Sequence, residues 1–216
     1  MDESTSREKI LKKVRAALLR KSNSEPADVD FDSPVFHETE EPLEIHFAQQ
    51  FTELNGQFVF CENEADFSYN IRALVDENKW EQVSCADPQL QLLLKKAGVN
   101  FQPVATFGKS WEAGITGCEF LVARTGSIVL SSKQESGRRG YAYPDHHIVV
   151  ARTSQLVYHL REALKAMKIK YPEMLPSQFT IVSGPSRTAD IEKTLVQGAH
   201  GPKEIYLFLI DDSITA

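Results

Sequence analysis

The feature that most constrains the fold is a regular alternation of short extended runs and helical segments over residues 43–107. Apolar runs such as QFVFC at 57–61 are separated by stretches in which apolar residues recur every three or four positions. This rhythm predicts an α/β domain with a mainly parallel sheet flanked by helices. The expected order is helix 43–54, strand 57–61, helix 64–79, strand 82–85, a helix opened by Asp87-Pro88 and an extended segment 99–107.

The second half of the chain starts with a different pattern. Two strand-like runs surround Arg124-Thr125-Gly126, which predicts an inserted antiparallel hairpin. A polar, glycine-bearing loop follows, and then the strand HIVVA. The remaining prediction is a helix over 153–167, a strand FTIVSG, a helix capped by Thr188 and a last strand EIYLFLI. A strand–helix–strand unit this short should be right-handed and parallel.

The N-terminal residues form a separate segment. Thr5-Ser6-Arg7-Glu8 matches a capping box, and the residues after it place Ile10, Leu11, Val14, Ala17 and Leu18 on one helical face. An acidic stretch rich in Ser and Pro follows. We therefore expect an N-terminal helix and acidic linker over 1–42 and an α/β domain over 43–216. The apolar face of the helix docks either on this domain, the commoner outcome, or on a partner chain.

Composition narrows the classes of function. The net charge of −6 argues against nucleic acid or an acidic membrane surface as the main partner. No apolar run is long enough to span a bilayer, and the first residues lack a hydrophobic signal core, so we expect a cytoplasmic protein. Cys61, Cys85 and Cys118 are far apart and form no CxxC pair. We expect buried free thiols and neither a metal site nor a cofactor in this chain.

The stretch SGPSRTADIE at 183–192 is the first candidate site. Gly184 allows backbone to approach a ligand, and a helix start at Thr188 with Ser186 and Arg187 beside it would bind phosphate or carboxylate. The alternative is a well-capped helix with a solvent-exposed arginine. From the residues alone the two interpretations are equally supported.

Three further features are candidates for the same ligand site. Thr125, Gly126 and Ser127 combine two hydroxyls with a flexible glycine and either bind an oxyanion or form a polar hairpin turn. Arg138 and Arg139 either clamp an anion or lie on the surface. His147, before a strand, is either a general acid or base or a hydrogen-bonded structural histidine.

The strings RTGSIVLSSKQESGRRGYAYPDHHIVVARTSQLV and IVSGPSRTADIEKTLVQGAHGPKEIYLFLIDD resemble the lactate-utilisation (LUD) domain family, over about residues 114–212. The resemblance is strongest to the small C-type subunits of bacterial L-lactate oxidation systems. It implies a fold like that of sugar-phosphate isomerases and CoA transferases, and partner subunits that carry the iron–sulfur clusters. The family pattern covers Thr125, Gly126, Ser127, Pro144, His147, Gly184, Pro185, Ser186, Arg187, Thr188, Asp190, Glu192, His200, Gly201 and Pro202. Arg124 and Ser127 depart from it, where relatives often have an acid and usually a threonine.

Three functional hypotheses follow. The leading one is an accessory subunit of a complex that oxidises L-lactate to pyruvate, with a cleft for a small anion. The second is a stand-alone isomerase or acyl-CoA transferase-like enzyme, for which Glu119 and Glu135 are the nearest nucleophile candidates. The third is a pure interaction module that docks through its N-terminal helix. Whether the chain is catalytic and whether it forms a homo-oligomer are left open by the sequence.

Overall fold

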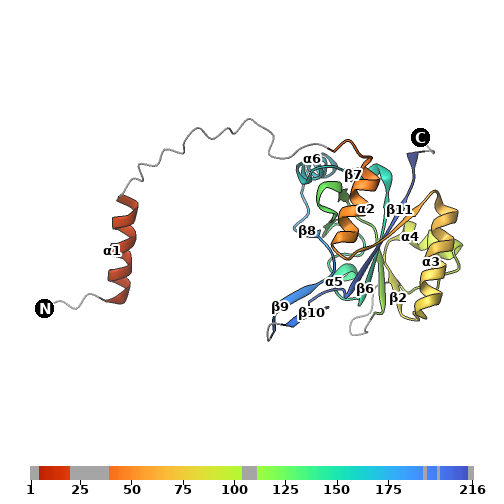
Figure 1. The fold of residues 1–216 in the computed structure, drawn as a ribbon, viewed down its shortest axis with the longest axis horizontal. Coiled ribbons are helices and arrows are strands. Elements are labelled where there is room, and N and C mark those ends of the chain that lie inside the picture. Colours follow the sequence, from red (N-terminus) through yellow and green to blue (C-terminus); the bar gives the residue numbers. More distant parts are fainter. Residues whose placement is uncertain (1–4, 20–38, 104–110, 192–193, 199, 214–216) are drawn as a thin grey trace. The chain divides into compact units, whose positions relative to one another are not determined.

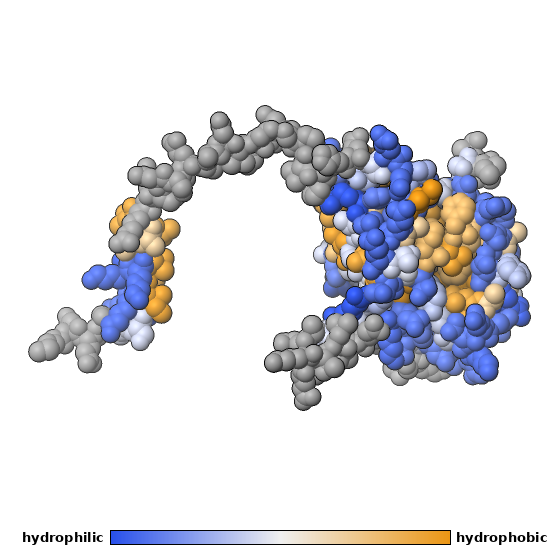
Figure 2. All heavy atoms as spheres, in the orientation of Figure 1, coloured by the Kyte–Doolittle hydropathy of each residue, from blue (hydrophilic) through white to orange (hydrophobic). Residues whose placement is uncertain are grey.

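The computed structural model describes residues 5–19, 39–103, 111–191, 194–198 and 200–213, and divides the chain into units 1–38 and 39–216. In the first unit, helix α1 (Ser6–Leu19) begins at the predicted capping box. The Thr5 N–H donates to Glu8 Oε2 at 2.9 Å, and the Glu8 N–H donates to Thr5 Oγ1 at 3.3 Å. Apolar side chains line one side of α1 (Figure 2), and none of its residues is buried.

The second unit is built on a five-stranded sheet in which every neighbouring pair is parallel (Figure 1). This confirms the α/β class. The strand order is β1 (Gln57–Cys61), β11 (Glu204–Ile210), β6 (His146–Arg152), β3 (Ala113–Thr116) and β2 (Val83–Cys85). Among the described strands, the last in sequence, β11, thus lies between the first, β1, and β6.

Local signals account for the helices around this sheet, which are α2 (Leu43–Glu53), α3 (Glu64–Asn78) and α4 (Pro88–Lys96). Asn63 caps α3 by accepting hydrogen bonds from two backbone N–H groups, and Asp87 caps α4 in the same way. After α2 the chain turns through Asn55, whose φ is 63°. Strand β1 and the helix starts at residues 43, 64 and 88 lie where the sequence predicts them.

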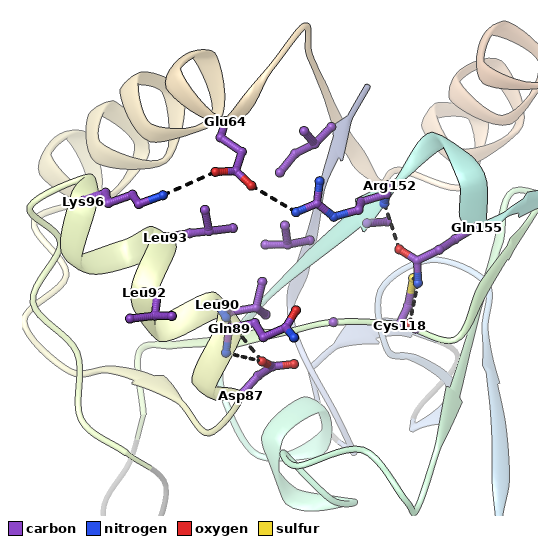
Figure 3. Close-up of a pocket in the computed structure, with 14 residues that line it drawn as sticks. Glu64, Asp87, Gln89, Leu90, Leu92, Leu93, Lys96, Cys118, Arg152 and Gln155 are labelled. Atoms are coloured by element: carbon purple, nitrogen blue, oxygen red, sulfur yellow. Dashed lines mark hydrogen bonds and ion pairs between the residues drawn. The ribbon is translucent and has the colours of Figure 1, made fainter. Parts of the chain in front are cut away.

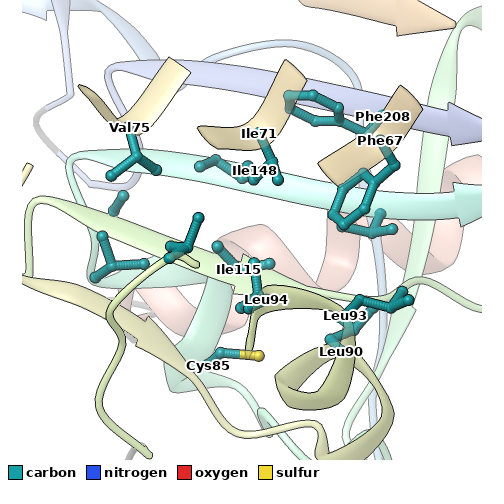
Figure 4. Close-up of a cluster of buried hydrophobic side chains, with 14 of the residues drawn as sticks. Phe67, Ile71, Val75, Cys85, Leu90, Leu93, Leu94, Ile115, Ile148 and Phe208 are labelled. Atoms are coloured by element: carbon teal, nitrogen blue, oxygen red, sulfur yellow. The ribbon is translucent and has the colours of Figure 1, made fainter. Parts of the chain in front are cut away.

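Alternating residues of the parallel strands supply two cores, one on each face of the sheet. On one face, α3 and α4 pack against the strands, as in the edge-to-face contact of Phe67 with Phe208 at 5.6 Å (Figure 4). On the other face, Phe47 and Phe51 of α2 stack at 5.5 Å and pack with Val149 and Leu207. Both faces of β6 and β11 are therefore covered, which explains their nearly continuous apolar sequence.

A second, four-stranded sheet packs over the α2 side of the main sheet. Its order is β7 (Leu156–Val157), β4 (Phe120–Val122), β5 (Ser127–Ser131) and β8 (Phe179–Val182). β4 and β5 form the predicted antiparallel hairpin, joined by the 3₁₀ turn Ala123–Thr125 and Gly126. Helix α6 (Leu160–Lys170) packs against this sheet, and the short α5 (Arg139–Ala142) lies in the polar loop.

The structure corrects three predictions in the second half of the domain. The predicted helix 153–167 is a 3₁₀ turn (Thr153–Gln155), strand β7 and then α6. The helix predicted to start at Thr188 is instead the antiparallel hairpin β9 (Arg187–Ile191) and β10 (Thr194–Gln197). β8 pairs antiparallel with β5, so the predicted right-handed parallel unit at the end is also wrong. The β-branched residues of TADIEKTLVQ favour this hairpin. Of the extended segment 99–107, residues 104–107 lie outside the described residues.

Candidate functional site

The carboxyl ends of all five parallel strands meet at one edge of the main sheet, where open α/β sheets place ligands. A cavity of about 520 Å³ opens there (Figure 3), and we call it the edge cavity. α3, α4 and the segments after β3 and β6 contribute its walls. Its lining residues are Glu64, Asp87, Gln89, Leu90, Leu92, Leu93, Lys96, Gly117, Cys118, Val150, Ala151, Arg152, Gln155 and Ile210.

Two cations in the edge cavity share one carboxylate. Arg152 Nη2 lies 3.1 Å from Glu64 Oε1, and Lys96 Nζ lies 3.6 Å from Glu64 Oε2 (Figure 3). Two cations and one carboxylate give this triad one excess positive charge. All three side chains are partly exposed, so the charge lies at a solvent-accessible wall of the cavity. The fourth charged group, Asp87, accepts two backbone hydrogen bonds from α4 through Oδ1. The cavity therefore combines an apolar floor with guanidinium and ammonium groups, which recognise carboxylates and phosphates.

A smaller hollow of about 210 Å³ adjoins the edge cavity and shares Asp87, Gly117 and Cys118 with it. We call it the side pocket. Its other lining residues are Glu119, Lys133, Gln134, Glu135, Ser136, Lys170 and Tyr171. Gly117 marks the junction, and an added Cβ there would meet only ordinary contacts, at 3.8 Å from Asp87 and 3.9 Å from Gln134.

Glu119 is the buried charge of the side pocket, with 3% of its surface exposed. Its carboxylate accepts hydrogen bonds from the Ser131 hydroxyl, from Tyr171 Oη at 3.0 Å and from Lys170 Nζ at 2.7 Å. Burial, followed by the Glu119 charge, raises the pKa of Tyr171. Burial would lower the pKa of Lys170, but the hydrogen bond and charge of Glu119 outweigh it and raise that pKa. The ammonium and the phenol thus stay protonated at neutral pH.

The predicted catalytic candidate, His147, lies in neither hollow. It is the second residue of β6, near the amino end of the strand, and only 1% of its surface is exposed. Its Nε2 lies 2.8 Å from Thr116 Oγ1, and its ring centroid is 6.2 Å from that of Tyr141. Burial lowers the pKa of His147 to about 3, so the ring is neutral at pH 7. This geometry fits the structural alternative, while a catalytic role stays an untested prediction.

Two of the predicted binding turns do come together, at the carboxyl end of α2. The Gly126 position approaches the backbone of Phe51, and the Gly184 position approaches the carbonyl oxygen of Leu54. Arg187 Nη2 donates to that same carbonyl oxygen at 2.8 Å. Arg187 therefore satisfies a terminal carbonyl of α2, where the helix dipole favours a cation.

Hydroxyl groups join the same two turns to each other. Ser127 Oγ donates to Thr125 and also lies 2.8 Å from Ser183 Oγ, next to Gly184. Ser127 is buried, with 2% of its surface exposed. The contacts described for Thr125, Gly126, Ser127 and Gly184 are thus made within the protein, and ligand binding by these residues remains a prediction.

The remaining predicted residues lie elsewhere. Arg138 Nη2 donates to Ser177 Oγ at 3.2 Å, and Arg139 begins α5. The Ser186 N–H donates to the Pro202 carbonyl, and Thr188 pairs with Val196 in the β9–β10 hairpin. A single hollow floored by the amino end of a last helix, as the sequence suggested, is wrong because no helix starts at Thr188.

Sequence reasoning missed most of the residues that line the two hollows. Glu64, Asp87 and Arg152 each stand within three residues of the carboxyl end of a parallel strand. This position in the sequence is the signal that could have identified them as residues of a site. For Glu119, the sequence predicts only a nucleophile in the enzyme hypothesis. The structure shows both of its oxygens hydrogen-bonded inside the protein.

The three thiols are free and buried, as predicted. Burial raises the pKa of Cys61 to about 11 and that of Cys85 to about 12, and it also raises the pKa of Cys118. Within the part of the chain that the structure describes, no three His, Cys, Asp or Glu residues are grouped to hold a metal ion. Among those same residues, no helix has the length and apolar character needed to cross a membrane.

Comparison with known proteins shows that part of this chain is similar to a known family. Residues 107–210 match the LUD domain model. The chain is 37% identical over 100 residues to Lactate utilization protein C from Deinococcus radiodurans, covering 46% of each protein. It is 36% identical over 108 residues to Lactate utilization protein C 1 from Bacillus mycoides, covering 49% of this chain and 46% of the relative. These alignments span about half the length of the relatives.

A solved structure supports the fold. A DUF162 family protein from Deinococcus radiodurans superimposes with a TM-score of 0.55, covering 78% of this chain and 96% of that one. Its sequence identity is 18%, so the likeness concerns the fold alone.

Proposed function

We propose that this chain takes part in lactate utilization, because its residues 107–210 match the LUD domain model. The proposed role is an accessory subunit of a cytoplasmic complex that oxidises L-lactate to pyruvate. The names of the matched relatives, Lactate utilization protein C and C 1, support a role in this process. The resemblance seen in the sequence supports partner subunits that carry the iron–sulfur clusters, since the chain itself has no CxxC pair.

The edge cavity supports the ligand class of this proposal. Lactate and pyruvate are small carboxylates, and a guanidinium group binds a carboxylate through parallel N–H donors. Arg152 places such a group on the wall of the cavity, with Lys96 beside it. The volume of about 520 Å³ is within the range of small-molecule sites. The proposed ligand is therefore a small organic carboxylate held by Arg152.

Calorimetric titration of the protein with L-lactate and with pyruvate tests this site, with CoA and a sugar phosphate as comparison ligands. Arg152→Ala should weaken carboxylate binding by about tenfold or more, because a charge-assisted hydrogen bond contributes roughly 1.5–3 kcal/mol. The matched control is Arg72→Ala, which removes an arginine of α3 paired with Asp76 and outside the edge cavity. Equal affinities for the wild type and Arg152→Ala would remove Arg152 from the site.

A variant of Glu64 is expected to change the affinity for the carboxylate in the opposite direction. In the unliganded protein its carboxylate occupies both cations and competes with a bound carboxylate. Glu64→Gln should therefore tighten lactate or pyruvate binding severalfold in the same titration. A weaker affinity in Glu64→Gln would mean that Glu64 orients Arg152 more than it competes with the ligand.

The interaction-module hypothesis has one observation in its favour, the apolar face of α1, which includes Ile10, Val14 and Leu18 and is not buried within its own unit. If partners dock there, deletion of residues 1–38 should abolish co-purification with iron–sulfur subunits while residues 39–216 stay folded by circular dichroism. Partners that still co-purify would exclude α1 as the docking element.

For the enzyme hypothesis, a covalent CoA adduct on Glu119 or Glu135, seen by mass spectrometry, is the decisive result.

A further inference from the structure

We propose that a groove beside α2 on the second unit is the docking site for the apolar face of α1 from the same chain. We call it the flank groove. It has a volume of about 510 Å³ and is lined by α2, by the edge strand β1 and by the segments after β6 and β11. The proposal goes beyond the proposed function, because it rests on neither the edge cavity nor a partner subunit.

The apolar side of the flank groove is an uncovered part of the main sheet. Phe58 and Phe60 of β1 point to the same face of the sheet, because side chains alternate along a strand. Phe58 packs against Phe47 of α2, with ring centroids 6.2 Å apart, whereas Phe60 is 43% exposed. Ile45 of α2 also lines the groove and is 51% exposed. Parallel sheets have both faces covered by helices, so a further helix on this surface would complete the layer.

The charges of the flank groove and of α1 are opposite in sign. Among the described residues that line the groove, Glu44 and Asp211 are the charged ones, and none is a lysine or an arginine. The Ser213 N–H donates to Asp211 Oδ1 at 2.9 Å and lowers the pKa of Asp211, so this carboxylate is ionised at neutral pH. α1 contains five cations and one acid, which give it a net charge of +4. A basic helix therefore complements this groove.

The side-chain pattern of α1 suits the same surface. Ile10, Val14 and Leu18 recur every four residues and form an apolar stripe that is not buried within its own unit. At 3.6 residues per turn, Lys13 and Arg15 flank this stripe, one on each side. Amphipathic helices commonly bind by laying such a stripe into an apolar groove, with their charges at its rim.

The connection between α1 and the groove favours docking within one chain. α1 ends at Leu19, and Pro42 lines the groove. The 22 residues between them can span at most about 75 Å, which is more than the diameter of a domain of this size. A tether of this length gives α1 an effective concentration at the groove on the order of millimolar. At lower protein concentrations, docking within the chain therefore prevails over docking on a second copy.

Amide hydrogen exchange of the full chain, measured by mass spectrometry, tests this proposal. A helix of 14 residues is marginally stable by itself in water, so the amides of α1 exchange slowly only if α1 is docked. The double variant Ile45→Ser/Phe60→Ser should lower the protection of α1 by about tenfold or more, because it removes two apolar contacts from the groove. Both side chains are partly exposed, so the variant should fold. The matched control, Ile169→Ser on α6, removes an exposed apolar side chain outside the groove and should leave α1 unchanged.

Carbodiimide cross-linking identifies the surface that α1 contacts. The reagent joins a lysine amine to a carboxylate as an amide, with loss of water, where the two side chains touch. We expect cross-links from the lysines of α1 to Glu44 or Asp211 within single chains, and fewer of them in the double variant. The proposal is overturned if α1 exchanges as fast in the full chain as in a peptide of residues 1–21, or if the wild type and the double variant protect α1 equally. It is also overturned if these cross-links form only between two copies of the chain.

Discussion

Gly126→Ala is expected to lower the free energy of unfolding by about 3 kcal/mol or more, through overpacking and a strained backbone. Gly126 has a φ of +55°, and an added Cβ would lie 2.5 Å from the backbone nitrogen of Phe51 and 2.6 Å from the carbonyl carbon of Gln50. These are backbone atoms of α2, which cannot move aside as the end of a flexible side chain can. Urea denaturation followed by circular dichroism measures the loss.

Gly137 is the matched control for this prediction. Its φ of +53° is almost the same, but nothing lies within 4 Å of an added Cβ. Gly137→Ala should therefore cost only about 1 kcal/mol, from backbone conformation alone. Equal losses for the two variants would show that the approach of α2 contributes nothing at Gly126. A large loss confined to Gly126→Ala would explain the Thr-Gly-Ser turn by packing, without a ligand.

Lowering the pH from 7 to 5 is expected to destabilise the protein by about 2 kcal/mol through His147 alone. Burial lowers the pKa of His147 from 6.5 to about 3 in the folded state. Between these values the unfolded chain binds a proton that the folded chain does not. The stability contributed by the neutral ring is therefore complete above pH 6.5 and is lost progressively as the pH falls towards 3.

His147→Gln separates this effect from the other titrating groups. Glutamine does not ionise and can still hydrogen-bond the Thr116 hydroxyl, which His147 contacts at 2.8 Å. The stability difference between the wild type and His147→Gln should shrink by about 2 kcal/mol between pH 7 and pH 5 in urea titrations. Parallel pH profiles for the two proteins would contradict a buried, neutral His147.

The sequence predicts the parallel body well because its signals there are local. Residues 57–61 form β1 as expected, and Asp87 caps α4 with Pro88 at its first position. The error at Thr188 has a different origin. Ser, Arg and Thr before Ala-Asp-Ile-Glu satisfy the rules for a helix start, but the pairing of β9 with β10 depends on residues further along the chain. A local pattern cannot decide between two such structures.

The candidate site could be predicted only in part. The sequence places Glu64 and Arg152 after strands, but their meeting depends on the strand order, which local patterns do not give. The prediction of ligand binding at two glycines has a physical alternative. Gly126 and Gly184 do allow close backbone approach, as expected, but the approaching group is α2 and not a ligand. Glycine allows close approach of a ligand and of another part of the protein alike, so its presence alone does not tell which of the two occurs.

The central position of β11 has a consequence for synthesis on the ribosome. β1 hydrogen-bonds only with β11 in the described sheet, and β11 is made about 140 residues after β1, as the last of the strands that the structure describes. Phe58 and Phe60 therefore emerge long before their partner strand does. The nascent chain has to keep an unpaired apolar strand soluble until residues 204–210 leave the exit tunnel, so binding by a chaperone should improve the yield of this domain.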